Sequence, residues 1–214
     1  ISPNDYHSYV GLGESYHNSG RYNSASRTFV YAEEPHDGIS MNVTGQNWFT
    51  RYMLANVNRE LGEHDEAIAG LQEVLTGRAE EFGVLIALLQ TYIEKAWRCV
   101  ETGFFGQAAH SAVQAIELSQ KIAELRPQAF NLWKAVGDAC SIFYWIQDRL
   151  DIFPSNMTKQ MLTKDVDVKE FSILSEIDGV DSKVLESSTG DENAVACPEY
   201  LALSLLAYKR AIFS

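Results

Sequence analysis

The chain has 214 residues, of which 46% are hydrophobic, so it is long enough for one domain or one stretch of repeats with a real core. Its formal net charge of −12 argues against nucleic acid as a direct partner, because phosphate backbones are bound mainly by Lys and Arg. The longest apolar run, residues 82–89, is too short to span a bilayer, so no membrane partner is expected.

The first predicted element is a helical hairpin over residues 6–39. Apolar and small residues recur at helical spacing on both sides of Gly20, which we expect to end the first helix in a left-handed turn. We expect small residues where the two helices touch and aromatic residues in the space between them. The set is Tyr9, Leu12, Gly13, Tyr16, Gly20, Tyr22, Ala25, Phe29 and Ala32. This spacing resembles one 34-residue tetratricopeptide unit, a repeat that binds other molecules and does not catalyse.

Two further hairpins are predicted over residues 48–81 and 82–126, the first of them after a loop near residues 35–45. The third hairpin is longer, with its turn at Gly103 and its end at Arg126-Pro127. Its Lys95-Ala96 pair departs from the repeat pattern. The residues that align the second hairpin with the first are Leu54, Gly62, Ala67 and Leu71.

A fourth hairpin begins at residue 130, and the pattern predicts that it is interrupted. Its first helix, residues 130–150, carries Trp133, Gly137 and Cys140 at the repeat positions of the first unit. Its second helix, residues 198–214, carries Ser204, Tyr208 and Ala211 at the spacing of Ala25, Phe29 and Ala32. The sequence therefore predicts an all-α fold, a right-handed superhelical solenoid of tetratricopeptide hairpins whose last member is interrupted by a long acidic loop.

The predicted insertion covers residues 151–197 and is expected to be flexible. Ten acidic residues and four lysines between residues 151 and 192 give that stretch a net charge of −6, half of the total. Loops of this length in compact domains are commonly functional or disordered. Three interpretations stay open: a disordered spacer, a surface that docks a basic partner, and an autoinhibitory element.

Signatures of catalysis are absent from the sequence. The five histidines lack the His-x-x-x-His spacing of a metal site. The Gly11-x-Gly13 pair lacks the third glycine of a dinucleotide fingerprint and lies inside a predicted helix. Three distant cysteines without a Cys-x-x-Cys motif fit a reduced, cytosolic or nuclear compartment. We expect no enzyme activity, no catalytic residue, no cofactor and no bound metal. The start at Ile1 and the helical pattern at the last residues suggest a fragment of a longer protein.

The remaining candidate site is a peptide groove along the first helix of each hairpin, which lines the concave face of such repeats. The candidate concave-face residues are His7, Glu14, His17, Asn18, Tyr52, Asn56, Arg59, Lys134 and Asp138. Chaperone-binding repeats hold a terminal carboxylate with a Lys and an Asn, but Val10 and Glu14 occupy those positions here. A carboxylate clamp is therefore not expected in this hairpin. The plain alternative is that these residues face water or other parts of a longer solenoid.

Two motifs together carry a more specific resemblance. They are Val10-Gly11-Leu12-Gly13-Glu14-Ser15-Tyr16 with Ser19-Gly20-Arg21-Tyr22, and Asn131-Leu132-Trp133-Lys134-x-x-Gly137-Asp138-Ala139-Cys140. This combination resembles the large tetratricopeptide subunit of the superkiller complex, over most of residues 6–150 and more weakly over 198–213.

The resemblance implies a cytosolic scaffold without an active site. It would hold a Ski2-like RNA helicase and WD-repeat subunits and couple them to the RNA exosome for 3′-to-5′ decay of messenger RNA. It also implies that this segment does not bind nucleic acid directly. The alternative function is a peptide-binding tetratricopeptide adaptor for chaperones or transport. A stable multi-subunit complex would favour the scaffold, and affinity for a short free peptide would favour the adaptor.

Overall fold

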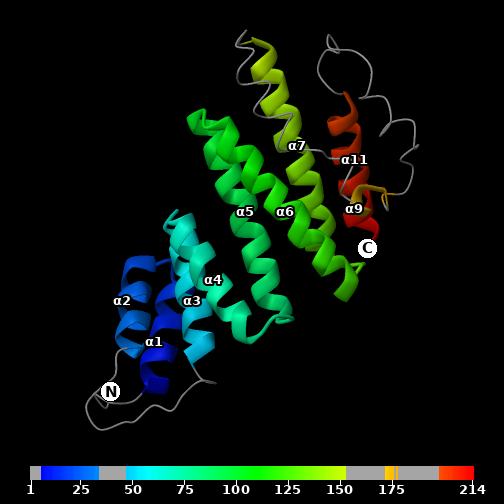
Figure 1. Cartoon of the computed structure of the whole chain (residues 1–214). Helices are drawn as coiled ribbons and strands as arrows, with labels where there is room; N and C mark the ends of the chain where they lie inside the picture. The colour runs from blue at the N-terminus through cyan, green and yellow to red at the C-terminus, as the bar shows by residue number, and fades with distance from the viewer. Residues whose placement is uncertain (1–5, 34–46, 153–171, 176, 178–197) are drawn as a thin grey trace. The chain divides into compact units, whose positions relative to one another are not determined.

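The computed structural model describes residues 6–33, 47–152, 172–175, 177 and 198–214, and within these residues the secondary structure is helical with no strand. The all-α, tetratricopeptide-type fold is thereby confirmed. The chain divides into two units, Ile1–Thr91 and Tyr92–Ser214. The helices are α1 (Tyr6–Asn18), α2 (Tyr22–Glu33), α3 (Asn47–Glu60), α4 (His64–Gly77), α5 (Phe82–Thr102), α6 (Phe105–Leu125), α7 (Phe130–Ile152), α9 (Ser172–Ser175) and α11 (Pro198–Phe213) (Figure 1).

Three turns between paired helices are built alike on glycine. Gly20, Gly62 and Gly103 have φ values of 72°, 81° and 82°, in the left-handed region that side chains with a Cβ disfavour. At the first turn the amide of Gly20 donates to the carbonyl of His17 at 3.0 Å, and the amide of Arg21 donates to the carbonyl of Tyr16 at 2.9 Å. The same two bonds recur at the other turns, so each first helix ends in a Schellman cap.

In the first hairpin, α1 and α2 approach most closely where Gly13 meets Phe29. A Cβ placed on Gly13 would lie 2.5 Å from Cε1 of Phe29, so the aromatic ring occupies the space that a side chain would need. Ala25, Phe29 and Ala32 are buried in the centre of this hairpin. The partly buried residues Tyr9, Tyr16 and Tyr22 pack against the same core, and Leu12 is half-buried beside them.

The second hairpin, α3 with α4, has a larger residue on its first helix and a smaller one on its second helix at the equivalent positions. Gly13 lies seven residues before its turn glycine and Phe29 nine after it, and the equivalent pair here is Ala55 and Leu71, both buried. Ala67 is also buried, and Leu54 packs against the core that α1, α2 and α3 share. Leucine thus takes the repeat position of Phe29 and alanine that of Gly13, and a Cβ on Gly70 of α4 would lie 3.2 Å from the Cβ of Ala55.

Arg51 links three helices of the first unit. Its guanidinium pairs with Glu73 on α4, and its Nε lies 3.6 Å from the Glu33 carboxylate on α2. Burial raises the pKa of the Glu33 carboxyl above its usual value, while Arg51 lowers it and Glu73 adds to the rise. At the open end of the hairpin, the Arg78 guanidinium lies 4.4 Å from the centre of the Trp48 ring.

The third hairpin consists of the longer helices α5 and α6. The equivalent pair around Gly103 is Ala96 and Ala112, and both are fully buried. Ala108 and Ala115 are fully buried on the same face of α6. Helix α6 ends at Leu125, directly before Arg126 and Pro127.

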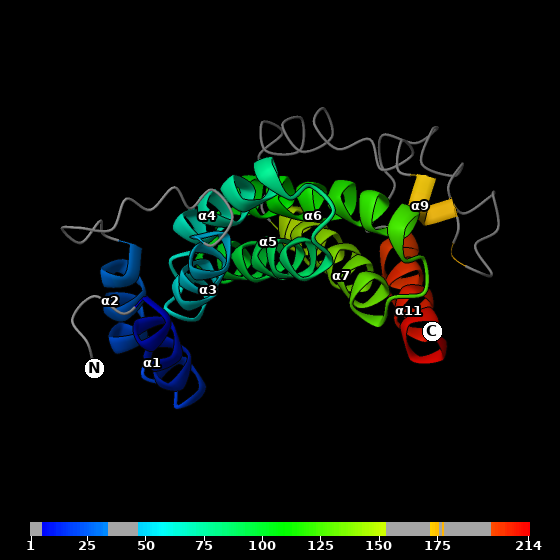
Figure 2. The same ribbon diagram turned by 90° about the horizontal axis from the view of Figure 1, so that it is seen from below.

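In the second unit, α7 and α11 lie side by side although 45 residues separate them in the sequence (Figure 2). Gly137 on α7 meets Tyr208 on α11, and a Cβ on this glycine would lie 2.7 Å from Cδ1 of the tyrosine. Trp133, one turn before Gly137, is fully buried, and its Nε1 donates to the carbonyl of Pro127 at 2.7 Å. The Arg210 guanidinium lies 3.8 Å from the centre of the Trp133 ring. Burial raises the pKa of the Cys140 thiol to about 12.

The segment between α7 and α11 lies largely outside the described residues, as does the predicted loop at residues 35–45. Within that segment, α9 packs against α6. Ile173, Leu174 and Ile177 are buried there. This short piece of the acidic insertion therefore contributes three apolar side chains to the core of the second unit.

The contact between Gly13 and Phe29 predicts opposite effects of two glycine substitutions on one helix. Gly13→Ala should lower the free energy of unfolding by about 1–3 kcal/mol, because the Phe29 ring must move. Gly11→Ala is the matched control, since its Cβ would have no neighbour within 4 Å. It should raise the free energy of unfolding by up to about 1 kcal/mol through helix propensity. Urea unfolding followed by circular dichroism measures both, and equal effects would contradict this packing.

Candidate protein-binding face

Seven of the nine predicted concave-face residues lie in the first unit, and Lys134 and Asp138 lie in the second. On α1, His7 and Asn18 are exposed, while Glu14 and His17 are half-buried. Tyr52, Asn56 and Arg59 lie on one face of α3, because residues spaced by four and three share a helix face. The structure brings these three together with the first half of α5, which the sequence analysis did not include.

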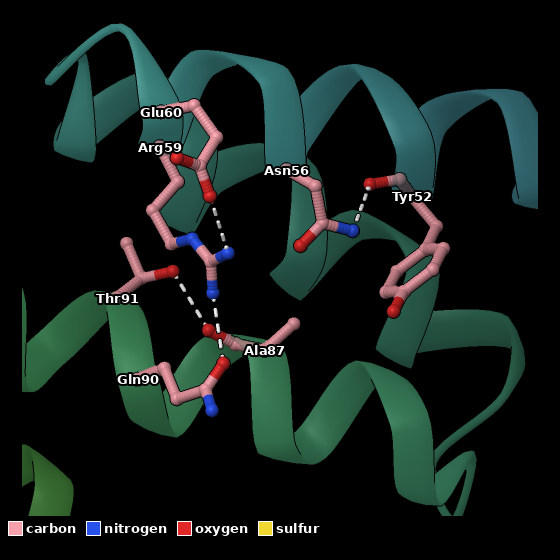
Figure 3. Close-up of polar contacts among 7 residues, drawn as sticks. All are labelled: Tyr52, Asn56, Arg59, Glu60, Ala87, Gln90 and Thr91. Atoms are coloured by element: carbon pink, nitrogen blue, oxygen red, sulfur yellow. Dashed lines mark hydrogen bonds and ion pairs between the residues drawn. The ribbon is translucent and has the colours of Figure 1, made fainter. Parts of the chain in front are cut away.

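Asn56 is the most enclosed polar residue of this group, with only 9% of its surface exposed. Its Nδ2 donates to the carbonyl oxygen of Tyr52 at 2.9 Å (Figure 3). A carboxamide has two N–H donors and one oxygen acceptor, so this bond uses one of its three groups and fixes its orientation. Asn56 is therefore held in place by its own helix before any partner arrives.

Arg59 fixes the geometry between α3 and α5. Its Nη1 donates to Oε1 of Gln90 on α5 at 2.8 Å, and its Nη2 lies 2.8 Å from the Glu60 carboxylate (Figure 3). The side chain is 15% exposed, so the ion pair with Glu60 is partly shielded from water. Next to Gln90, Thr91 turns its hydroxyl to the carbonyl of Ala87 at 2.7 Å, within its own helix.

Sequence reasoning missed Gln90, although one signal was present. The residues from Val84 to Leu89 are an apolar run, and Gln90 is the first polar side chain after it. A polar residue at that point on a buried helix needs a partner, because an unpaired buried polar group is costly. Arg59 is that partner.

The α3–α5 face, defined by Tyr52, Asn56, Arg59 and Gln90, is close to neutral, because Glu60 balances the Arg59 charge. Fixed amide groups and a phenol can donate to and accept from a peptide backbone. No nucleophile paired with a base lies among these residues. The arrangement is thus suited to binding a protein surface.

The α1 candidates do not join this cluster through any described hydrogen bond. The His17 ring meets Tyr22 at 5.7 Å between ring centres, edge to face, and the His7 ring meets Tyr6 at 5.4 Å. A bond between the Tyr6 hydroxyl and Thr50 connects α1 to α3 instead. The concave role of His7, Glu14, His17 and Asn18 stays a prediction.

Lys134 and Asp138 are engaged inside the α7–α11 pair. The Tyr208 hydroxyl donates to Oδ1 of Asp138 at 2.6 Å, and Lys134 donates to Oδ2 at 2.7 Å. One turn further, the hydroxyls of Ser141 and Ser204 are 2.7 Å apart. Burial, followed by the bond to Asp138, raises the pKa of Tyr208 to about 12, so the phenol remains a donor at neutral pH. These two candidates serve helix pairing in this structure.

The described residues are 6–33, 47–152, 172–175, 177 and 198–214. There, no group of three His, Cys, Asp or Glu side chains could hold a metal ion. No helix in the same residues is long and apolar enough to cross a membrane.

Known proteins with similar sequences come from fungi and vertebrates, while no family model matches the chain. Superkiller protein 3 of Schizosaccharomyces pombe is 30% identical over 164 residues, which cover 76% of this chain and 11% of that protein. Superkiller protein 3 of Saccharomyces cerevisiae is 27% identical over 202 residues, 92% of this chain and 13% of that protein. Tetratricopeptide repeat protein 37 of Xenopus laevis is 28% identical over 142 residues, 66% of this chain and 9% of that protein.

The chain therefore corresponds to a small part, 9–13%, of the length of these relatives. The name of the Xenopus laevis relative agrees with the repeat pattern of the sequence and with the paired helices of the structure. The chain is a superkiller protein 3-like tetratricopeptide protein.

Proposed function

We propose that this chain is part of a non-catalytic scaffold subunit of a superkiller-type complex. The observation that carries the proposal is the similarity to superkiller protein 3 over 92% of the chain. A human relative, 25% identical over 142 residues, is named superkiller complex protein 3, which supports membership of a complex. The whole protein's partners and role are inferred from these relatives and from the two sequence motifs.

The physical character of the chain supports a scaffold. Gly13 packs against Phe29 and Gly137 against Tyr208, so these repeat residues are used to pair helices. The α3–α5 face offers neutral, pre-oriented hydrogen-bonding groups, which suit a protein partner better than an anionic nucleic acid. The net charge of −12 also disfavours an anionic nucleic acid as a partner.

The proposed partners follow from the superkiller resemblance. They are a Ski2-like RNA helicase, WD-repeat subunits and an adaptor of the RNA exosome, and the proposed process is 3′-to-5′ decay of messenger RNA in the cytoplasm. In this arrangement the helicase contacts RNA, and the scaffold holds the helicase. The chain itself supplies binding surfaces and no chemical step.

The adaptor alternative draws on one specific feature, the enclosed Asn56 carboxamide. An oriented carboxamide can pair with the amide groups of a short extended peptide. The two functions predict different partners bound to the protein after purification. A scaffold keeps large subunits in fixed ratio, whereas an adaptor exchanges its peptides.

Affinity purification of the tagged full-length protein from cytosolic extract tests the scaffold proposal. We expect an RNA helicase and a WD-repeat protein in near-stoichiometric amounts, measured by quantitative mass spectrometry. Retention after a wash at high salt is also expected, since stable interfaces are largely apolar. Chaperones as the sole partners would contradict the scaffold and support the adaptor.

Asn56→Ala tests whether the α3–α5 face contacts these subunits. The change removes the oriented carboxamide but no intrahelical backbone bond, so the free energy of unfolding should fall by about 1 kcal/mol or less. If the face is an interface, the yield of at least one subunit should fall about tenfold, as at a buried contact. The matched control is Asn23→Ala on the exposed surface of α2. Equal yields from both variants would place the interface elsewhere.

A further inference from the structure

The short helix α9 and the residues just after it place three aliphatic side chains in the second unit. Ile173, Leu174 and Ile177 are 1%, 0% and 2% exposed. The amide of Ile177 donates to the carbonyl of Leu174 at 3.4 Å, so the turn continues beyond α9. Residues 173 and 177 are four apart, which puts them on one side of this turn. Helix α9 packs against α6 and lies beside its C-terminal part in Figure 2.

The position of α9 depends on this contact, because nothing local holds the segment in place. A helix of four residues is not stable alone, since its first turn fixes several dihedral angles for one hydrogen bond. Its sequence neighbours include Glu170, Glu176 and Asp178, and acidic segments of this kind normally stay in water. The three aliphatic side chains therefore hold the segment by filling an apolar site, which we call the α6 site.

The pairing of the neighbouring helices does not require α9. Helices α7 and α11 meet directly through Gly137 and Tyr208 and through the hydroxyls of Ser141 and Ser204. Helix α7 also packs directly against α6. Among the described helices of the first unit, α2 packs against α1 and α3, and α4 packs against α3, with no additional short helix. Helix α9 is thus an addition to the repeat and can leave without breaking a helix pair.

We propose that the α6 site is a docking site for a short helical segment of a partner protein, and that residues 173–177 occupy it when the partner is absent. The bound segment itself defines the chemistry of the partner. It is one helical turn with the pattern aliphatic-aliphatic-x-x-aliphatic and acidic flanks, as in Ile173, Leu174 and Ile177. Short amphipathic helices bind apolar sites through such closely spaced anchors.

The occupant belongs to the same chain, which makes it a competitor of the partner. Residues 153–171 connect it to α7 and residues 178–197 connect it to α11, so it stays near its site when it dissociates. A tethered ligand of this kind acts at a raised effective concentration. The partner segment therefore binds in proportion to the fraction of chains whose α6 site is open. This competition is independent of the α3–α5 face and of the proposed scaffold function.

The test compares the complete wild-type chain with a release variant that combines Ile173→Ser, Leu174→Ser and Ile177→Ser. The probe is a fluorescein-labelled peptide with the sequence of residues 169–180, followed by fluorescence anisotropy. We expect the release variant to bind the peptide saturably, and the wild-type chain to bind it at least tenfold more weakly, because its own segment competes. A peptide carrying Leu174→Asp should bind neither chain.

Phe104→Ser is the matched control for exposing or removing an apolar side chain elsewhere. Phe104 is 60% exposed at the turn between α5 and α6, so this variant should bind the peptide as weakly as the wild type. Circular dichroism should show the same helix content in all variants. If the release variant does not fold, Ile177→Ser alone should give a dissociation constant between those expected for the other two chains.

Three binding results would overturn the proposal: no peptide binding by any folded variant, equal binding by the wild-type chain and the variants, or equal binding of the Leu174→Asp peptide. Failure of both the release variant and Ile177→Ser to fold would also overturn it, because α9 would then be a permanent part of the core. Sedimentation of the wild-type chain gives a separate check. A dimer that the serine substitutions abolish would place the segment on a second copy and would contradict occupancy within one chain.

Discussion

The structure depends on the close approach of paired helices, and this approach depends on the absence of a side chain at one position. Phe29 and Tyr208 each lie where the opposite helix has a glycine, and a Cβ there would meet the ring within 2.8 Å. Where the second helix has leucine or alanine instead, the first helix has alanine, as at Ala55 and Ala96. The size of one residue thus limits the size of its partner, because interiors are close-packed. Each hairpin therefore matches the sizes of these two residues, and no particular residue type is needed at either position.

A second pair of repeat positions carries a different side-chain interaction in each of three hairpins. Eleven residues on either side of the turn glycine, the first hairpin has the ring pair Tyr9 and Tyr31, whose centres are 4.6 Å apart. The second hairpin has the ion pair between Arg51 and Glu73 at this position. The equivalent pair across α7 and α11 is Trp133 and Arg210, a cation–π contact. Three different interactions can occupy this position because each joins two helices that already pack closely at Gly13, Ala55 and Gly137. The same pairing rule therefore holds across the interrupted hairpin.

Much of this arrangement could be predicted from local sequence. Gly20 and Gly62 mark turns because a left-handed residue favours glycine, and Phe29 follows at a fixed distance. Asn56 and Arg59 were predicted as site residues from their repeat positions. The bond of Arg59 to Gln90 was not predicted, because Gln90 belongs to another hairpin. The bond between Asp138 and Tyr208 joins residues 70 positions apart, and no local pattern carries that information. The burial of Ile173 and Leu174 was also beyond prediction, since an acidic surrounding sequence is typical of solvated segments.

Helices α7 and α11 pack as one hairpin despite the insertion between them. A disulfide between positions 141 and 204 tests it most directly, because the two hydroxyl oxygens are 2.7 Å apart. Ser141→Cys with Ser204→Cys would be made in a chain whose Cys99, Cys140 and Cys197 are replaced by alanine. We expect oxidation to give this cross-link, identified by mass spectrometry of the digested protein. The cross-link should raise the free energy of unfolding by about 2–4 kcal/mol without loss of helix content. Failure of the two cysteines to join in the folded chain, or a loss of helix when they do, would contradict the account.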